Sequence, residues 1–196
     1  MEIAGERFHT QGYAATGVAE ILKQAGVGSG SLYHFFESKE DLLSAVLDGY
    51  LERLESDIFA PVFAQVRDPI ERIFAILAKY RGFLIANGCQ QGCPVANLVC
   101  ELGDTHPEVS RRVSNLFAAW RGGIERCLSE AADRLPSRLD HKAVAALVLS
   151  VFEGAVMQCR AARDIGPMDQ SIQQLRDYFE RLLADGPKRK KNERGK

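Results

Sequence analysis

The chain has 196 residues, of which 46% are hydrophobic and 26% charged, enough for one domain or one domain with a small helical head. This mixture excludes wholesale disorder, which requires low hydrophobicity and high net charge. A formal net charge of −1, from 25 basic and 26 acidic residues, gives no overall attraction to nucleic acid or to a membrane.

The charges are unevenly distributed along the chain. Residues 1–50 carry seven acids and three bases, whereas residues 187–196 carry six bases and one acid, so we expect 186–196 to be a basic, disordered tail. The first residues lack the basic stretch and apolar run of a secretory signal, and the longest apolar run, 143–152, is too short for a membrane span. With five cysteines and no signal, we expect free thiols in a cytoplasmic protein without a membrane contact.

Apolar residues recur at helical spacing along almost the whole chain, and no alternating strand pattern of useful length appears. The sequence therefore predicts an all-α protein of about nine helices. Capping residues and breakers place the later ones at 38–61 with Pro61 as its stop, 69–87, 94–102 with Gly103 as a left-handed stop, 107–128, 140–162 and 169–183.

The segment 141–162 is apolar over much of its circumference, which is unusual for a surface helix. The amphipathic segment 169–183 follows it directly. Two such helices from each of two chains would form a four-helix seam that closes by two-fold symmetry. Burial of 141–162 within a single chain is the alternative.

Two short helical patterns near the N-terminus are joined by a glycine. The first, 18–25, ends at Gly26, and the second covers 29–35. Two short helices with a tight glycine turn between them are typical of a helix-turn-helix, and Gly26 suits the positive φ of such a turn. We expect Val27 and Leu32 to fill the angle between the helices, and the second helix to enter the major groove of DNA.

The run from Gly12 to Leu43 resembles the DNA-binding head of the TetR/AcrR family of bacterial transcriptional repressors. The matching positions are Gly12-Tyr13, Thr16, Val18, Ile21, Ala25-Gly26-Val27, Gly30-Ser31-Leu32-Tyr33, Phe36, Lys39 and Leu42-Leu43. The rest of the chain resembles the family in length, helix count and order. The resemblance implies a DNA-binding head in residues 1–45, a ligand-binding and dimerisation domain in 46–185, a homodimer, and release of operator DNA when an unknown small-molecule effector binds.

The resemblance also implies which residues contact DNA. They are Thr16, Gly28, Ser29, Ser31, Tyr33, His34 and Lys39. Thr16, Tyr33 and Lys39 would hold phosphates, because hydroxyls, lysines and helix N-termini satisfy phosphate oxygens. The two serines and His34 would face base edges. Packing of Tyr33 and His34 against neighbouring apolar residues is the alternative.

Several departures from the family pattern bear on DNA binding. Leu22 replaces a small residue, and Gly17 replaces a hydroxyl that could reach a phosphate. The expected recognition helix lacks Arg, Lys, Asn and Gln, so sequence choice would depend on serine contacts, methyl packing and DNA shape. Met1 falls inside the expected first helix, so the basic segment that usually precedes this helix is missing. The acidic head predicts that DNA affinity depends only modestly on salt concentration, unless the basic tail offsets the charge of the head.

The segment 92–102 resembles the corresponding helix in a subset of the family, some of which respond to electrophiles or oxidants through a cysteine. Cys93 lies at the expected first turn of this helix, where the helix dipole lowers the pKa of a thiol. A buried, inert cysteine is the alternative. Further candidates for the ligand pocket are Asn97, Tyr80, Phe83 and Trp120, although aromatic residues at helical spacing are also typical of a core.

Other classes of protein have less support in the sequence. Cys89, Cys93, Cys100 and His106 contain no paired C-x-x-C, so we expect neither a metal nor another cofactor. The four histidines are scattered, and no nucleophile elbow, phosphate loop or H-E-x-x-H motif occurs, so we do not expect an enzyme. We expect a repressor released from its operator by a small molecule or a thiol-reactive compound. A helical dimeric scaffold or sensor that does not bind DNA, or an enzyme, is the alternative.

Overall fold

The computed structural model describes residues 1–28 and 35–187, and these residues are helical throughout, without a β-strand. The elements are α1 (Glu2–Gln11), α2 (Val18–Ala25), α4 (Lys39–Arg53), the π-helical segment η1 (Leu54–Phe59), α5 (Ala60–Gln65), α6 (Pro69–Ala86), α7 (Pro94–Leu102), α8 (Pro107–Glu130), the 3-10 segment η2 (Ala132–Arg134), α9 (His141–Ala162) and α10 (Gly166–Asp185). The all-α prediction is confirmed, and the expectation of about nine helices is close. The expected helix at 29–35 lies almost entirely outside the described residues, and so does most of the expected tail.

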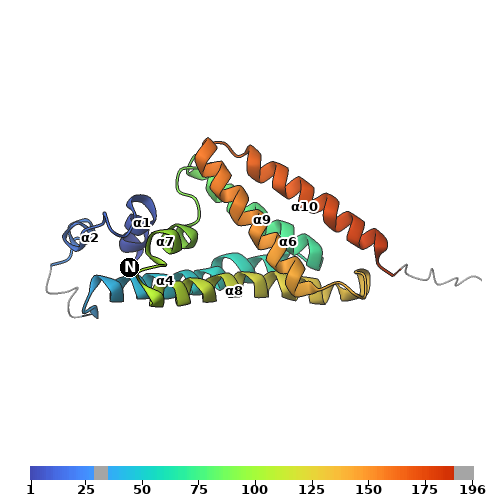
Figure 1. Ribbon diagram of the computed structural model, residues 1–196, viewed down its shortest axis with the longest axis horizontal. Helices are drawn as coiled ribbons and strands as arrows, with labels where there is room; N and C mark the ends of the chain where they lie inside the picture. Colours follow the sequence, from blue (N-terminus) through green and yellow to red (C-terminus); the bar gives the residue numbers. More distant parts are fainter. Residues whose placement is uncertain (29–34, 188–196) are drawn as a thin grey trace, which may run out of the picture.

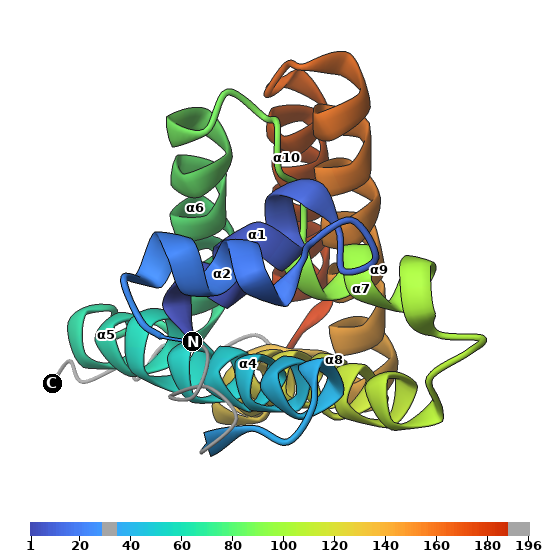
Figure 2. The ribbon, with the colours of Figure 1, turned by 90° about the vertical axis from the view of Figure 1, so that its left-hand side faces the viewer.

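The helices form an elongated molecule with the head at one end. Figure 1 shows α1 and α2 at the left, α4 and α8 running together along the length of the molecule, and α10 at the opposite end. Figure 2, viewed from the head, places α1 and α2 in front of the helices α6, α9 and α10. The helix α9 packs against α8, α10 and α6, and α1 packs against α4 and α7.

Local capping explains where several helices begin. The Asp68 carboxylate accepts hydrogen bonds from the Ile70 and Glu71 amides at 2.8 and 3.2 Å, which caps α6. Ser38 caps α4 by accepting from the Asp41 amide at 3.0 Å, and Asp140 caps α9 in the same way. These three predicted starts are confirmed, because a cap depends only on residues two or three positions away.

Two predicted helix ends are wrong. Pro61 does not stop the helix that begins after Ser38, because the π-turn of η1 shifts the backbone bonding and places Pro61 in the first turn of α5. Gly103 ends α7 with a right-handed backbone (φ −55°), not a left-handed one. The absence of a side chain at Gly103 instead permits close packing, since a Cβ at this position would lie 2.6 Å from the Val99 carbonyl oxygen.

The turn after α2 is partly as predicted. Gly26 has φ +66°, and the Val27 amide reaches back to the Leu22 carbonyl at 3.2 Å, as in a left-handed helix end. Val27 is 45% exposed, and the second helix against which it was expected to pack lies outside the described residues, so its role stays a prediction. The left-handed residue turns the chain away from the buried face of α2, and Ile21 and Leu22 supply the buried contacts. Leu32 lies outside the described residues.

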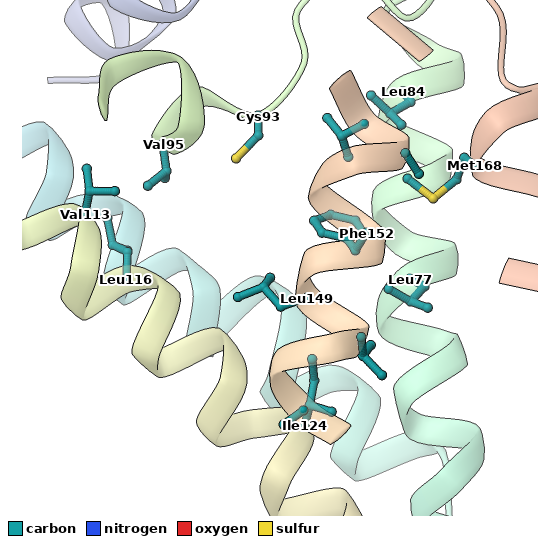
Figure 3. Close-up of a cluster of buried hydrophobic side chains, with 14 of the residues drawn as sticks. Leu77, Leu84, Cys93, Val95, Val113, Leu116, Ile124, Leu149, Phe152 and Met168 are labelled. Carbon is teal, nitrogen blue, oxygen red and sulfur yellow. The ribbon is translucent and has the colours of Figure 1, made fainter. Parts of the chain in front are cut away.

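One continuous apolar core joins the head to the body of the molecule. It includes Phe8 of α1 and Leu42 of α4, and it continues through the side chains of α6, α8 and α9. Figure 3 shows part of this core, with Leu116 on α8, Phe152 on α9 and Leu77 on α6. The helix α4 runs through the expected domain boundary at residue 45, so the head and the body share both a helix and a core.

We expect two neighbouring glycines of α8 to respond in opposite ways to replacement by alanine. A Cβ at Gly123 would lie 2.4 Å from the Phe59 ring, which is buried against Phe63 and Trp120, so Gly123→Ala should lower the free energy of unfolding by about 1–3 kcal/mol. Gly122 has nothing within 4 Å of its Cβ position, so Gly122→Ala should raise it by about 0.5–1 kcal/mol. Urea unfolding measures both changes, and equal effects would contradict this packing.

Candidate DNA-binding head and ligand cavity

The helices α1 and α2 of the head are joined by the side chain of Arg7. Its guanidinium forms an ion pair with Glu20 and donates a hydrogen bond to Gln24, both on α2. Beneath them, the Phe8 and Tyr13 rings lie 5.3 Å apart in the core of the head. The orientation of α2 is therefore fixed by contacts with α1.

The residues expected to contact DNA fall into two groups. Ser29, Ser31, Tyr33 and His34 lie outside the described residues, while Gly28 lies at their edge and is exposed. Thr16 is only 1% exposed, and its hydroxyl donates to the Gly12 carbonyl at 2.7 Å. The Thr16 hydroxyl thus closes the turn between α1 and α2, and the expected contact of Thr16 with a phosphate stays a prediction.

Lys39 is also engaged within the head. Its ammonium donates to the Tyr13 carbonyl at 2.5 Å and lies 4.0 Å from the centre of the Tyr13 ring. Burial lowers the pKa of Lys39, and the nearby carboxylates of Glu101 and Glu40 oppose that effect. This contact joins the start of α4 to the turn after α1, and the expected phosphate contact of Lys39 stays a prediction.

The helix α7 holds the turn between α1 and α2 through Glu101. The two carboxylate oxygens accept hydrogen bonds from the backbone amides of Tyr13 and Ala14, at 2.9 and 2.7 Å. Sequence reasoning missed Glu101, because an exposed glutamate on a helix gives no signal for contacts made 88 and 87 residues away. Charge-assisted bonds of this kind are stronger than neutral ones, so Glu101 is a main attachment of the head to the body.

His9 forms a second attachment between the head and the body. Its Nε2 lies 3.1 Å from the carbonyl oxygens of both Gln91 and Gly92, which can only accept, so Nε2 carries the proton. The ring stacks on Phe83 of α6, with centroids 6.3 Å apart. Burial is the main cause that lowers the pKa of His9, which favours the neutral ring at pH 7.

A cavity of about 480 Å³ lies between the head and the body. Its walls include the predicted pocket residues Tyr80, Phe83, Cys93 and Trp120, together with residues of α1 and α4. The predicted residue Asn97 is not part of the wall. Its side chain instead accepts from Arg160 of α9 at 2.7 Å and donates to the Gln91 carbonyl at 3.0 Å, so it braces α7 against α9.

Cys93 begins α7 as predicted, but its thiol is not activated. Its sulfur accepts a hydrogen bond from the Ala96 amide at 3.5 Å, and Figure 3 shows the side chain extending into the space between α7, α8 and α9. Burial raises the pKa of Cys93 far above its usual range, and the neighbouring Glu153 raises it further. The expectation of a lowered pKa is therefore wrong, because the loss of solvent outweighs the helix dipole and the two backbone amides.

All five cysteines are free thiols, and four of them, including Cys89 and Cys93, are buried. Cys100 is exposed. Within the part of the chain that the structure describes, no three histidine, cysteine or acidic side chains are placed to hold a metal ion. The cavity wall itself presents aromatic rings, including those of Tyr80 and Trp120, and single polar groups.

The carboxyl of Glu153, on α9, lies in the cavity wall and was not identified from the sequence. Burial raises its pKa to about 7, and the hydrogen bond with Cys93 offsets this only in part. Among the ion pairs of the described residues, none joins Glu153 to a lysine or an arginine. In the sequence, Glu153 is one acid in an apolar helix, and only the folded chain shows that it faces a cavity.

Comparisons with known proteins agree with this architecture. A family model described as "Bacterial regulatory proteins, tetR family" matches residues 2–46, and one described as "Tetracyclin repressor-like, C-terminal domain" matches residues 69–175. An uncharacterized HTH-type transcriptional regulator of Mycobacterium tuberculosis is 30% identical over 186 residues, which are 91% of this chain and 90% of the relative. The HTH-type transcriptional repressor DhaR of Mycobacterium sp. strain GP1 is 27% identical over 178 residues, 90% of this chain and 86% of DhaR.

Solved structures show the same fold. The crystal structure of a TetR transcriptional regulator from Chloroflexus aurantiacus has a TM-score of 0.80 and 27% identity, covering 92% of this chain and 91% of that one. These matches define an HTH-type transcriptional regulator, and they point to regulators rather than to enzymes. The chain belongs to the TetR family and is a ligand-responsive DNA-binding regulator.

We expect removal of the Glu101 carboxylate to loosen the turn between α1 and α2. In Glu101→Ala the amides of Tyr13 and Ala14 lose their acceptors, so their hydrogen exchange should accelerate about tenfold or more. Glu101→Gln keeps one acceptor oxygen and should give an intermediate rate. Cys100→Ala, at the neighbouring exposed position of α7, is the control and should leave both rates unchanged. Unaltered exchange in Glu101→Ala would contradict the proposed attachment.

We expect Glu153 to make stability depend on pH. Its pKa of about 7 in the fold exceeds the usual 4.5, so the unfolded chain loses this proton first and stability falls as the pH rises from about 4.5 to about 7. Glu153→Gln should therefore unfold with a free energy about 1–3 kcal/mol higher than wild type at pH 8, but with almost no difference at pH 4.5. Urea unfolding at the two pH values tests this, with exposed Glu52→Gln as the control. A variant that is less stable at pH 8 would contradict it.

Proposed function

We propose that a small organic effector binds in the cavity and changes the position of the head, and that this controls operator binding by a cytoplasmic homodimer. One observation carries the proposal: the cavity wall is shared between the two parts of the chain. Gly5 and His9 of α1 face it from the head, and Tyr80 and Trp120 face it from the body. A bound molecule can therefore stabilise one head position over another, which is the condition for a ligand to shift an equilibrium.

The proposed route to DNA runs along α4. This helix begins directly after the expected recognition segment, and its residues Tyr50 and Arg53 line the cavity. The Tyr50 hydroxyl also donates to the Gly5 carbonyl at 3.2 Å, so α4 and α1 would move together. Two recognition helices must lie about 34–36 Å apart to enter successive major grooves, so a small movement of both heads would weaken binding at both half-sites.

The proposed dimer uses residues 141–162 and 169–183. On α9, Leu147 and Met157 are 44% and 64% exposed, and they lie on one face of the helix. By length and composition α9 could also cross a membrane, but apolar helices of soluble proteins pass the same test. Its packing on α8 and α10 supports an outer face that a second copy covers, with the same surface used by both copies.

In this proposal the head, residues 1–45, contacts DNA through the segment that follows α2. Ser29, Ser31 and His34 would face base edges, and Tyr33 would hold a phosphate. Gly28, which is exposed, would let the backbone approach the duplex. The name of DhaR as a transcriptional repressor supports repression as the mode of action. The thiol of Cys93 is buried and its pKa is raised, so it stays protonated. This supports a pocket that binds the effector, rather than a reactive thiolate, as the sensor.

Footprinting on the DNA upstream of its own gene tests the proposal. We expect wild-type protein to protect two symmetric half-sites, and His34→Ala to lower the affinity at least tenfold. Met157→Glu should give a monomer by light scattering and abolish protection, because it places a charge in the proposed interface. Ile85→Glu, at an apolar position on α6 that is 49% exposed, is the control and should remain dimeric and bind DNA. Absence of any protected site would favour a helical scaffold instead.

A further inference from the structure

The cavity has a wall of aromatic rings centred on Tyr80. Its ring centroid lies 4.8 Å from that of Phe152, 5.5 Å from that of Phe83 and 6.5 Å from that of Trp120. Trp120 and Phe152 are themselves stacked, with centroids 5.5 Å apart. Glu153 is adjacent to Phe152 on α9 and brings a carboxyl to the same wall.

The charged groups around the cavity leave this carboxyl without a counter-charge. The described lining residues include four acids and only two bases, Arg53 and Lys79. The Arg53 guanidinium lies over the Tyr50 ring, 5.0 Å from its centre, and the Lys79 ammonium donates to the Asp57 carbonyl at 3.0 Å. Both bases are thus engaged at other sites. His9, the remaining basic group, is held by the two carbonyls described above and adds no positive charge at pH 7.

An ionised carboxylate in an apolar cavity without a partner is unfavourable, and the raised pKa of Glu153 reflects that cost. A positively charged ligand removes it, because the ligand brings the missing counter-charge. The faces of tryptophan, tyrosine and phenylalanine rings also attract a cation by about 0.5–2 kcal/mol each, more when water is excluded. Carboxylate and rings therefore favour the same kind of ligand.

We propose that the effector is a lipophilic organic cation, a protonated amine or quaternary onium group on an apolar body, with Glu153 as its counter-charge and the rings around Tyr80 as its binding surface. This inference rests on the proposed function, because it names the chemical class of the effector. A volume of about 480 Å³ suits a drug-sized molecule. An anion would meet an excess of acids, and a neutral molecule would leave Glu153 unpaired.

The test uses two probes of nearly equal size and opposite charge, tetraphenylphosphonium and tetraphenylborate. Trp120 is the one tryptophan of the chain and lies in the cavity wall, so its fluorescence reports occupancy directly. We expect saturable quenching by tetraphenylphosphonium, with an affinity at least tenfold higher than that for tetraphenylborate. Glu153→Gln should weaken binding of the cation about tenfold or more and leave binding of the anion equal or stronger.

Glu52→Gln is the control variant, because it removes an exposed acid of α4 that lies outside the cavity wall. It should change the affinity for the cation less than threefold. Since Glu153→Gln is expected to stabilise the unliganded fold at neutral pH, a loss of cation binding in it cannot be ascribed to unfolding. Equal affinities for the two probes, or unchanged cation binding in Glu153→Gln, would overturn the proposal.

Measuring operator affinity with the same probes separates this proposal from the proposed function. If the cation quenches Trp120 but operator affinity is unchanged, the ligand class holds and the proposed control of DNA binding fails. If a neutral compound releases the protein from DNA while the cation does not bind, the control holds and the cationic class fails. Release of DNA by the cation in wild type, lost in Glu153→Gln, supports both.

Discussion

The arrangement of this regulator depends on how α1 is attached to the rest of the chain. Glu101 and the carbonyls of Gln91 and Gly92 hold the two ends of one short stretch, from His9 to Ala14. All three of these acceptors lie in α7 or in the loop before it, and they add to the packing of α1 on α4 and of the His9 ring on Phe83. The position of α7 therefore contributes to the position of α1, and through Arg7 to that of α2.

The same element borders the cavity. Cys93 and Val95, at the start of α7, lie in its wall, and Glu101 lies almost two turns further along the helix. A ligand that displaces the start of α7 would therefore act on the attachment at Glu101 as well as on His9, which lies in the cavity wall itself. In this layout the cavity and the head share one helix of nine residues, through which the proposed coupling between ligand and head can act.

The sequence predicts the local features of the structure well. The caps at Ser38, Asp68 and Asp140 and the left-handed Gly26 follow from neighbouring residues, and the structure has them as predicted. The expected lowering of the pKa of Cys93 was wrong, because burial determines it and burial is set by distant residues. The roles of Glu101 and Glu153 could not be predicted from the sequence, since the surroundings of these two side chains form only when α7 and α9 pack. The recognition segment at 29–34 remains a prediction.

Arg160 connects α9, the helix of the proposed dimer interface, to α7. It lies three residues beyond Met157 on α9, and it holds Asn97 of α7. The helix whose outer side is available to a second copy is thus also a support of the element that carries the head. If the two copies pair through α9, binding of an effector in the cavity of one subunit would alter the support of α7 in the other subunit. The two cavities would then not bind effector independently. The response to effector concentration would then depart from a simple hyperbola, with a Hill coefficient different from one.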